Sequence, residues 1–347
     1  REYLIGQDPL RIEHHWQYMY RCFHFRGAAV MGALSAIDIA LWDIAGKFYG
    51  VPVYQLLGGK CRDTVRVYSH VSGGSFEELM ESCLAEKEKG FTAIGHLSPF
   101  LDEPRNTRYF ETYARKISSG VERIGKIREA VGLDVDLCIE NHRRLNPAEA
   151  VALAAQLEPL LPMFYEDPIL PDNFDSMAWV AQKIRIPLAT GERIHTPQEY
   201  QMLVKRQALD YLRVSICVCG GFTGAKKIAA IAEANQIGII PHNPLSPVAT
   251  AACIQFDAAT PSFTIQEYPD PDGPAAHARF VFEKTGKSAF RASDIVNVMP
   301  ECRDGFLVVP DAPGIGIELV EGVEEKFPFE RRKVVTRLTT DGAVMDQ

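Results

Sequence analysis

The sequence predicts an α/β protein whose main part is a (β/α)8 TIM-type barrel. Three similar units follow one another between Asp136 and Glu192, each a short apolar run that ends in a carboxylate and precedes a helix-like segment. The carboxylates Glu140, Glu166 and Glu192 are spaced by 26 residues, which matches one strand, one helix and two loops of such a barrel. The same alternation of strand and helix patterns continues on both sides of these units.

The composition is typical of a globular protein with a sizeable core. The chain has 347 residues, of which 46% are hydrophobic and 24% charged, which suits one or two domains. The net charge of −8 argues against nucleic acid as a partner, because binding phosphates needs a basic face. We expect no membrane partner, since no apolar run reaches the length of a span. The eight cysteines include no Cys-x-x-Cys pair, which favours a cytoplasmic protein.

Two helices are expected before the barrel, at residues 9–22 and 28–49. The first follows an Asp-Pro start signal. The second is strongly apolar around its circumference, so we expect it to be packed on most sides. Asp38 and Asp43 lie inside it, and we expect both to cap another element or to form salt bridges within the fold.

The barrel is expected to begin after Leu56-Leu-Gly-Gly-Lys60, where two glycines stop the helix and free the backbone for a hinge. We expect the eighth helix of the barrel to be displaced or degenerate. The stretch from Ala275 onward breaks the period, and we expect residues 315–319 to return to the N-terminal domain. Strands are expected near residues 65–70, 92–97, 136–141, 163–167, 187–191, 211–216, 237–241 and 263–267, and helices near 76–89, 107–131, 147–158, 174–184, 197–206, 221–234 and 247–258.

Polar side chains are expected at the C-terminal ends of the strands, where active sites of this architecture lie. Three carboxylates on one rim form a site for a hard cation, and oxygen ligands without cysteine favour Mg²⁺ over Zn²⁺. A lone glutamate before proline is more often salt-bridged, but three at equal spacing are not explained in that way. In strand order, the candidates are Glu140 and His142, Glu166, Glu192, Arg213 and Ser215, His242 and Asn243, and Glu267.

Several motifs resemble the enolase superfamily in its mandelate racemase branch, and within it the acid-sugar dehydratases that act on galactonate or mannonate. The resemblance covers nearly the whole chain. It is carried by Ser35-Ala-Ile-Asp-Ile-Ala-Leu-Trp-Asp-Ile44, Leu56-Leu-Gly-Gly59, Gly191-Glu-Arg193 and Pro241-His-Asn-Pro-Leu-Ser-Pro247.

The resemblance implies an α+β capping domain at residues 1–58, the barrel at 59–274, and a C-terminal segment at 275–347 that packs on both. Family members begin with a strand-rich part of the capping domain whose loop closes over the substrate. This sequence starts after that part, so we expect a truncated capping domain. The resemblance also implies a small sugar acid as the partner and a homo-oligomer.

The implied reaction is the dehydration of an aldonate to a 2-keto-3-deoxy acid through an enediolate. Glu140, Glu166 and Glu192 would bind one Mg²⁺ per subunit. His242 would take the α-proton and His142 would protonate the departing 3-hydroxyl, as suits a side chain that titrates near neutral pH. Two residues would bind the substrate: Glu267 at its carboxylate, and Arg213, which resembles the mannonate dehydratase pattern.

Three positions depart from the family pattern. Ser215 stands where many relatives have an aspartate that orients the histidine of strand seven. Gly95 stands where mannonate dehydratases have an arginine, and strand two also lacks the basic Lys-x-Lys of racemases and cycloisomerases. The neighbouring His96 is either a replacement group or a packed histidine. Glu140 stands where the family more often has aspartate.

These departures leave two alternatives open: a metal-binding homologue with little dehydratase activity, and an epimerase or racemase of hydroxy acids. The sequence does not identify the sugar acid. The segment 98–109 is a candidate specificity element, in which Arg105, Arg108 and Tyr109 either reach the substrate or belong to a solvated loop.

Overall fold

Eight parallel strands form the centre of the molecule in the computed structural model, which describes residues 2–22, 24–100, 108–271, 292–328, 331 and 336–345. Neighbouring strands follow the order of the chain from β1 to β7, and β8 pairs with β1. A parallel bridge between Ile239 and Phe263 joins the seventh strand to the segment leading into the eighth, so the predicted barrel is confirmed. The strands are β1 (Thr64–His70), β2 (Ala93–Leu97), β3 (Asp136–Glu140), β4 (Phe164–Glu166), β5 (Leu188–Thr190), β6 (Tyr211–Leu212), β7 (Gly238–Ile239) and β8 (Gln266–Tyr268).

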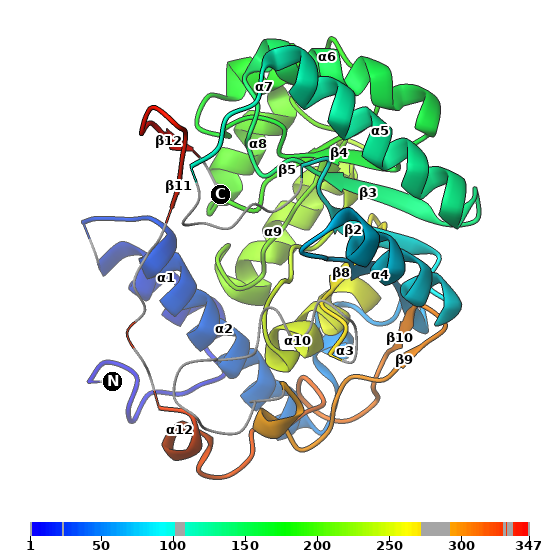
Figure 1. Cartoon of the computed structure of the whole chain (residues 1–347). Coiled ribbons are helices and arrows are strands. Elements are labelled where there is room, and N and C mark those ends of the chain that lie inside the picture. Colours follow the sequence, from blue (N-terminus) through cyan, green and yellow to red (C-terminus); the bar gives the residue numbers. More distant parts are fainter. Residues whose placement is uncertain are drawn as a thin grey trace.

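Helices alternate with these strands and cover the outside of the barrel (Figure 1). Their first turns use the capping signals of the sequence. Asn146 and Glu149 form a reciprocal capping box, as do Thr196 and Glu199, and each pair satisfies backbone N–H groups that a helix leaves open. The helices are α4 (Phe76–Glu88), α5 (Tyr113–Val131), α6 (Pro147–Leu157), α7 (Phe174–Ala181), α8 (Pro197–Lys205), α9 (Gly221–Ala234) and α10 (Pro247–Ala258).

The predicted elements agree with these bounds to within a few residues at most ends. The sixth and seventh strands are shorter than predicted, although the residues that follow them still bond to the neighbouring strands: the N–H of Arg213 donates to the carbonyl of Thr190, and that of Ile240 donates to the carbonyl of Leu212. The helix predicted from residue 107 begins at Tyr113, where Thr112 accepts a bond from the N–H of Arg115 and caps it. The earlier residues 101–107, including Arg105, lie outside the described part of the chain.

The barrel interior is filled by buried side chains that different strands direct inward. Tyr68 and Phe164 are the largest of this layer and meet edge to face, with ring centroids 6.0 Å apart. Such interdigitation makes the interior a packed core, which leaves the strand ends as the place for a site. The remaining members of the layer are Ala93, Cys138, Ala189, Ile240 and Ile265.

Three helices precede the barrel: α1 (Ile12–Cys22), α2 (Ala28–Tyr49) and α3 (Val53–Leu57). The first two lie beside α9 (Figure 1). Asp38 accepts a hydrogen bond from the N–H of Thr223 in the first turn of α9, and Asp43 pairs with Lys47 at 2.7 Å. The predicted capping and salt-bridging roles of both aspartates are therefore confirmed.

By length and composition alone, α2 could cross a membrane, with a window of mean hydropathy 1.6. The expectation that no apolar run is long enough was therefore wrong. A single helix of this kind is weak evidence for a span, because the core helix of a soluble protein passes the same test. Here α2 packs between α1 and α9.

The C-terminal segment returns to the first helices, as predicted. Gly314 forms a parallel bridge with Pro52, and the N–H of Ile315 donates to Asp43 at 2.8 Å. Before that return, β10 (Phe306–Val308) pairs antiparallel with β1 and with β9 (Cys302–Arg303). The last described elements are α12 (Val323–Lys326), β11 (Arg337–Leu338) and β12 (Val344–Met345).

Candidate active site

Three carboxylates from consecutive strands meet on the rim at the C-terminal ends of the barrel strands. Glu140 is the last residue of β3, Glu166 is the last residue of β4, and the two are paired in register. Glu192 follows β5 by two residues. One oxygen from each lies within 4.8 Å of the others. The structure thus brings together the three predicted ligands, because equal repeats of a parallel barrel end on the same face.

The cluster fits a hard divalent cation. Oε1 of Glu140 is buried and contacts Nε2 of His142 at 3.1 Å, and one oxygen of each carboxylate lies close enough to the others for all three to hold one ion. Oxygen ligands of this kind are those that Mg²⁺ takes up. Two arginines contact four of the carboxylates near this rim: Arg143 pairs with Asp167 and Glu192, and Arg213 pairs with Glu166 and Glu267.

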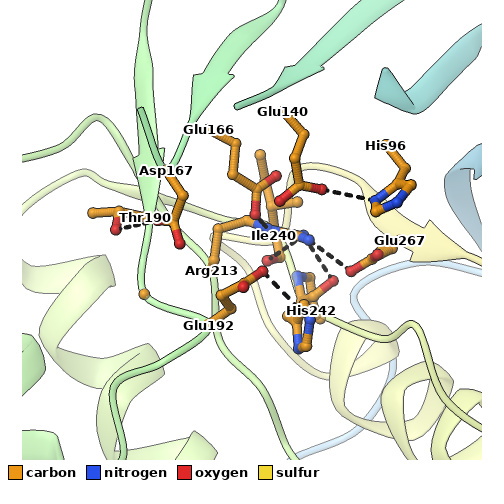
Figure 2. A network of polar contacts seen from close by, with 12 residues as sticks. His96, Glu140, Glu166, Asp167, Thr190, Glu192, Arg213, Ile240, His242 and Glu267 are labelled. Carbon is orange, nitrogen blue, oxygen red and sulfur yellow. Dashed lines mark hydrogen bonds and ion pairs between the residues drawn. The ribbon is translucent and has the colours of Figure 1, made fainter. Parts of the chain in front are cut away.

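Arg213, predicted to bind substrate, is fully buried and engaged by the protein itself (Figure 2). Its Nε donates to Glu166 and its second terminal nitrogen donates to Glu267 at 2.6 Å. The remaining terminal nitrogen donates to the carbonyls of Ile240 and Pro241 at 3.2 and 3.1 Å. In this arrangement the guanidinium ties a candidate metal ligand on β4 to a carboxylate on β8.

Glu267, predicted to hold the substrate carboxylate, is likewise surrounded by donors. Oε2 accepts from Arg213 and from the N–H of Asn243 at 2.8 Å, while Oε1 lies 2.7 Å from Nε2 of His70. Burial alone would raise the pKa of this carboxyl, but Arg213, His242 and His70 outweigh it and hold the pKa well below its usual range. Glu267 is thus a buried anion that protein groups contact at both of its carboxylate oxygens.

A second arginine, Arg143, links the neighbouring strand ends. Its terminal nitrogen lies 2.6 Å from Oε1 of Glu192 and 3.1 Å from Oδ2 of Asp167. Asp167 also accepts from the hydroxyl of Thr190 at 2.5 Å. Burial raises the pKa of Asp167 to about 7, and the charge of Glu192 adds to the effect. These contacts fix the orientation of Glu192.

The two predicted acid/base histidines lie at opposite ends of the carboxylate cluster. Nε2 of His142 is 3.1 Å from Oε1 of Glu140, and Nε2 of His242 is 3.5 Å from Oε2 of Glu192. Burial tends to lower the pKa of His142, but the charge of Glu140 outweighs it and raises that pKa. The two imidazoles thus contact the first and the third carboxylate of the cluster.

One ring nitrogen of His242 has no hydrogen-bond partner among the described residues. This nitrogen, Nδ1, is buried. Ser215, which stands where relatives were expected to have an aspartate, is buried in the segment after β6 that also carries Arg213. Among the residues that the structure describes, no carboxylate contacts the ring nitrogen that such a partner would fix.

Two further histidines lie at the ends of β1 and β2. The rings of His70 and His96 are stacked with centroids 5.1 Å apart, and His96 meets His142 edge to face at 4.6 Å. Nδ1 of His96 lies 3.0 Å from Oε2 of Glu140 (Figure 2). Of the two interpretations of His96, the structure therefore favours a residue of the site.

Gly95 is explained by packing inside the barrel. A Cβ atom at this position would overlap the ring of Tyr68, whose face also meets the guanidinium of Arg213 at 5.8 Å. A basic side chain at Gly95 would have to displace this ring. The tyrosine thus occupies the space in which relatives were expected to place an arginine.

A cleft of about 590 Å³ opens beside Glu192. Arg193 and His195 line it from the segment after β5, and Ala28 lines it from the start of α2. Two other candidate specificity residues, Arg108 and Tyr109, contact the C-terminal segment. Arg108 donates to the carbonyl of Thr340 at 3.3 Å, and the backbone N–H of Tyr109 donates to the carbonyl of Leu338 at 3.1 Å.

Sequence reasoning missed Arg143, Asp167 and His70. Asp167 adjoins Glu166 and Arg143 adjoins His142, so their closeness to the predicted ligands was a usable signal. His70 ends the first strand, where strand-end reasoning would also have found it.

The comparisons with known proteins agree with this geometry. Residues 81–323 match the family model described as enolase C-terminal domain-like, and residues 1–58 match the N-terminal domain of mandelate racemase/muconate lactonizing enzyme. A D-galactonate dehydratase family member from Streptomyces bingchenggensis is 34% identical, covering 99% of this chain and 85% of the relative. A D-mannonate dehydratase from Caulobacter vibrioides is 33% identical, covering 99% and 86%.

Solved structures are similar as well. An enolase from Pantoea ananatis with bound D-gluconate and Mg has a TM-score of 0.85 and 32% sequence identity, covering 100% of this chain and 87% of the other.

Proposed function

The chain belongs to the mandelate racemase/muconate lactonizing branch of the enolase superfamily, and on that premise we propose that it is a hydro-lyase that dehydrates a sugar acid. The observation that carries the proposal is the placement of His142 and His242 at opposite ends of a three-carboxylate cluster. Dehydration needs this arrangement, because one group removes a proton from C2 while another protonates the hydroxyl that leaves C3.

Glu140, Glu166 and Glu192 are proposed to hold one Mg²⁺. When bound, the cation supplies positive charge next to the substrate carboxylate, where negative charge develops as the C2 proton leaves. Arg143 and Arg213 each hold one of these carboxylates in place, so the ligands are oriented before the cation arrives.

His242 is proposed as the base. Its Nε2 faces Glu192, so a substrate held at the carboxylate cluster would present its C2 proton to this nitrogen. His142 is proposed as the acid, since Glu140 raises its pKa against the effect of burial and favours the protonated ring. The enol that forms on loss of the 3-hydroxyl would become a 2-keto-3-deoxy acid.

The cleft beside Glu192 is proposed to take the polyol end of the substrate. Arg193 and His195 offer donors there. Relatives are named for D-galactonate and D-mannonate, and a solved structure contains D-gluconate. Aldonates of six carbons are therefore the first substrates to test.

The test is an assay with a panel of D-aldonates, including these three, in D₂O with Mg²⁺. Dehydration gives a 2-keto-3-deoxy product with one deuterium at C3, detected by NMR. Deuterium at C2 without loss of water would indicate an epimerase or racemase instead. The matched control is His14→Ala, which removes an exposed histidine of α1. Neither product nor exchange across the panel would contradict the proposal.

The unpartnered Nδ1 of His242 favours one second candidate, a homologue with little dehydratase activity. Measured kcat/KM distinguishes the two. The proposed enzyme should turn over at least one aldonate at a rate that His242→Ala abolishes, whereas a weak homologue would show the same trace activity in both proteins.

A further inference from the structure

A second group of possible ligands lies on the outer side of Glu140. Nδ1 of His96 is 3.0 Å from Oε2 of this carboxylate, and Nε2 of His142 is 3.1 Å from Oε1. One donor atom from each of the three residues lies within 4.8 Å of the others. The group is distinct from the carboxylate cluster, with which it shares only Glu140.

The atoms are close enough for one ion to bind all three residues after a small adjustment. Ligand atoms about 2.0–2.1 Å from Zn²⁺ at tetrahedral angles are roughly 3.3 Å apart. The two ring nitrogens contact different oxygens of Glu140, at 3.0 and 3.1 Å, and one donor atom from each residue lies within 4.8 Å of the others. Coordination through one oxygen of Glu140 therefore requires a rotation of the rings or of the carboxylate.

The donor set differs in kind from the carboxylate cluster. Two imidazoles and one carboxylate suit Zn²⁺ and other transition metals, whereas carboxylates alone suit Mg²⁺. The fourth position would be left for water, as in zinc sites that have three protein ligands. The two groups should thus select different cations.

The ring of His96 is packed against a neighbouring histidine. The ring of His70 stacks on it with centroids 5.1 Å apart, and His70 is itself 2.7 Å from Oε1 of Glu267. This packing restricts the orientation of the His96 ring. The side chains of His96 and His142 are 23% and 27% exposed, so an ion from solvent can reach them.

We propose that His96, Glu140 and His142 form a second metal site, which binds Zn²⁺ beside the hard-cation site. Binding of the ion is independent of the reaction proposed above. One consequence does rest on that reaction: Zn²⁺ would occupy the nitrogen of His142 that protonates the leaving hydroxyl, and would therefore inhibit dehydration.

The first experiment measures Zn²⁺ binding by calorimetry in protein saturated with Mg²⁺. The exposed Cys22 and Cys61 are first changed to serine so that they do not bind zinc. We expect one equivalent of Zn²⁺ and a loss of affinity of at least about 100-fold in His96→Ala, because a ligand is removed. The matched control His14→Ala should bind as the parent does. Unchanged binding in His96→Ala overturns the proposal.

The second experiment locates the ion and covers the case in which His96→Ala folds poorly. His96→Asn keeps a polar side chain of smaller size, and circular dichroism checks its fold. Crystals of the parent soaked in Zn²⁺ should give an anomalous peak between His96, Glu140 and His142. A peak only among Glu140, Glu166 and Glu192, or only at the surface, overturns the proposal. Failure of the aldonate assay leaves both results unaffected.

Discussion

The rim of the barrel has two halves that are built differently. On β3, β4 and β5, Glu140, Glu166 and Glu192 reach one point because neighbouring parallel strands end in nearly the same register. On the remaining strands, the side chains are positioned by one another, as when Glu267 accepts from Arg213 and contacts His70. Backbone repetition therefore brings the carboxylates of the first half together, whereas the second half is assembled by a network of side chains.

Arg213 joins the two halves, since it contacts Glu166 on one and Glu267 on the other. A buried guanidinium between two buried carboxylates is costly to disturb, because each charge loses its partner in a low-dielectric interior. The comparison thus predicts which substitutions change chemistry alone and which also change stability.

The largest effect is expected from Glu192→Gln on the repetitive half. It removes a charged oxygen ligand, so Mg²⁺ affinity should fall and activity should decrease by about 10³-fold or more, because the cation supplies several kcal/mol of stabilisation. Calorimetry and the aldonate assay measure the two quantities. Glu129→Gln, exposed on α5, is the control. Normal Mg²⁺ affinity in Glu192→Gln would show that the cluster is not the metal site.

Arg213→Met tests the link between the halves. We expect the free energy of unfolding to fall by about 3–5 kcal/mol, because two buried carboxylates lose their partner. Denaturant unfolding measures it. Arg185→Met breaks the pair with Glu158, in which the arginine side chain is 82% exposed, and should change stability by less than about 1 kcal/mol. Equal losses in both variants would contradict the bridging role.

His242→Ala tests whether this histidine, which lies in the second half of the rim, acts in the reaction without contributing to metal binding. Activity should fall by about 10²–10⁴-fold, because general base catalysis is lost, while Mg²⁺ affinity stays near that of the parent. His142→Ala should also stop dehydration but keep deuterium exchange at C2, since the base is intact. NMR in D₂O distinguishes the two variants. Retained exchange in His242→Ala would assign the base to another residue.

Gly95→Ala tests the packing on strand two. The added methyl group would overlap the ring of Tyr68, so the free energy of unfolding should fall by about 1–3 kcal/mol. Thermal and denaturant unfolding measure it. Gly125→Ala on α5 is the matched control, because its Cβ would have open space, and it should be neutral or slightly stabilising. A stable Gly95→Ala would mean that Tyr68 can move aside.

Asp38 on α2, which accepts a hydrogen bond from the N–H of Thr223 at the start of α9, should make the stability depend on pH. Burial raises the pKa of Asp38 to about 7 from its usual 3.8, despite the bonds from Thr223. Between these values the folded chain retains a proton that the unfolded chain has lost, so stability falls as pH rises through this window. Asp38→Asn should flatten that decline in the unfolding midpoint, and exposed Asp134→Asn should not. An unchanged slope in Asp38→Asn would contradict the raised pKa.

The sequence was sufficient to predict the barrel and the carboxylate half of the site. Both follow from local regularities: the alternation of strand and helix patterns, capping pairs such as Asn146 with Glu149, and the spacing of Glu140, Glu166 and Glu192. These features act over a few residues or repeat at a fixed interval, so they can be seen without coordinates.

Only the tertiary structure decided the other half. Arg213 binds two carboxylates that are 47 and 54 residues away in the chain, and Gly95 is required by a tyrosine on the preceding strand. Neither pairing leaves a periodic signal, because it depends on where side chains from separate strands point inside the barrel. Burial then determines which of these charges must be paired.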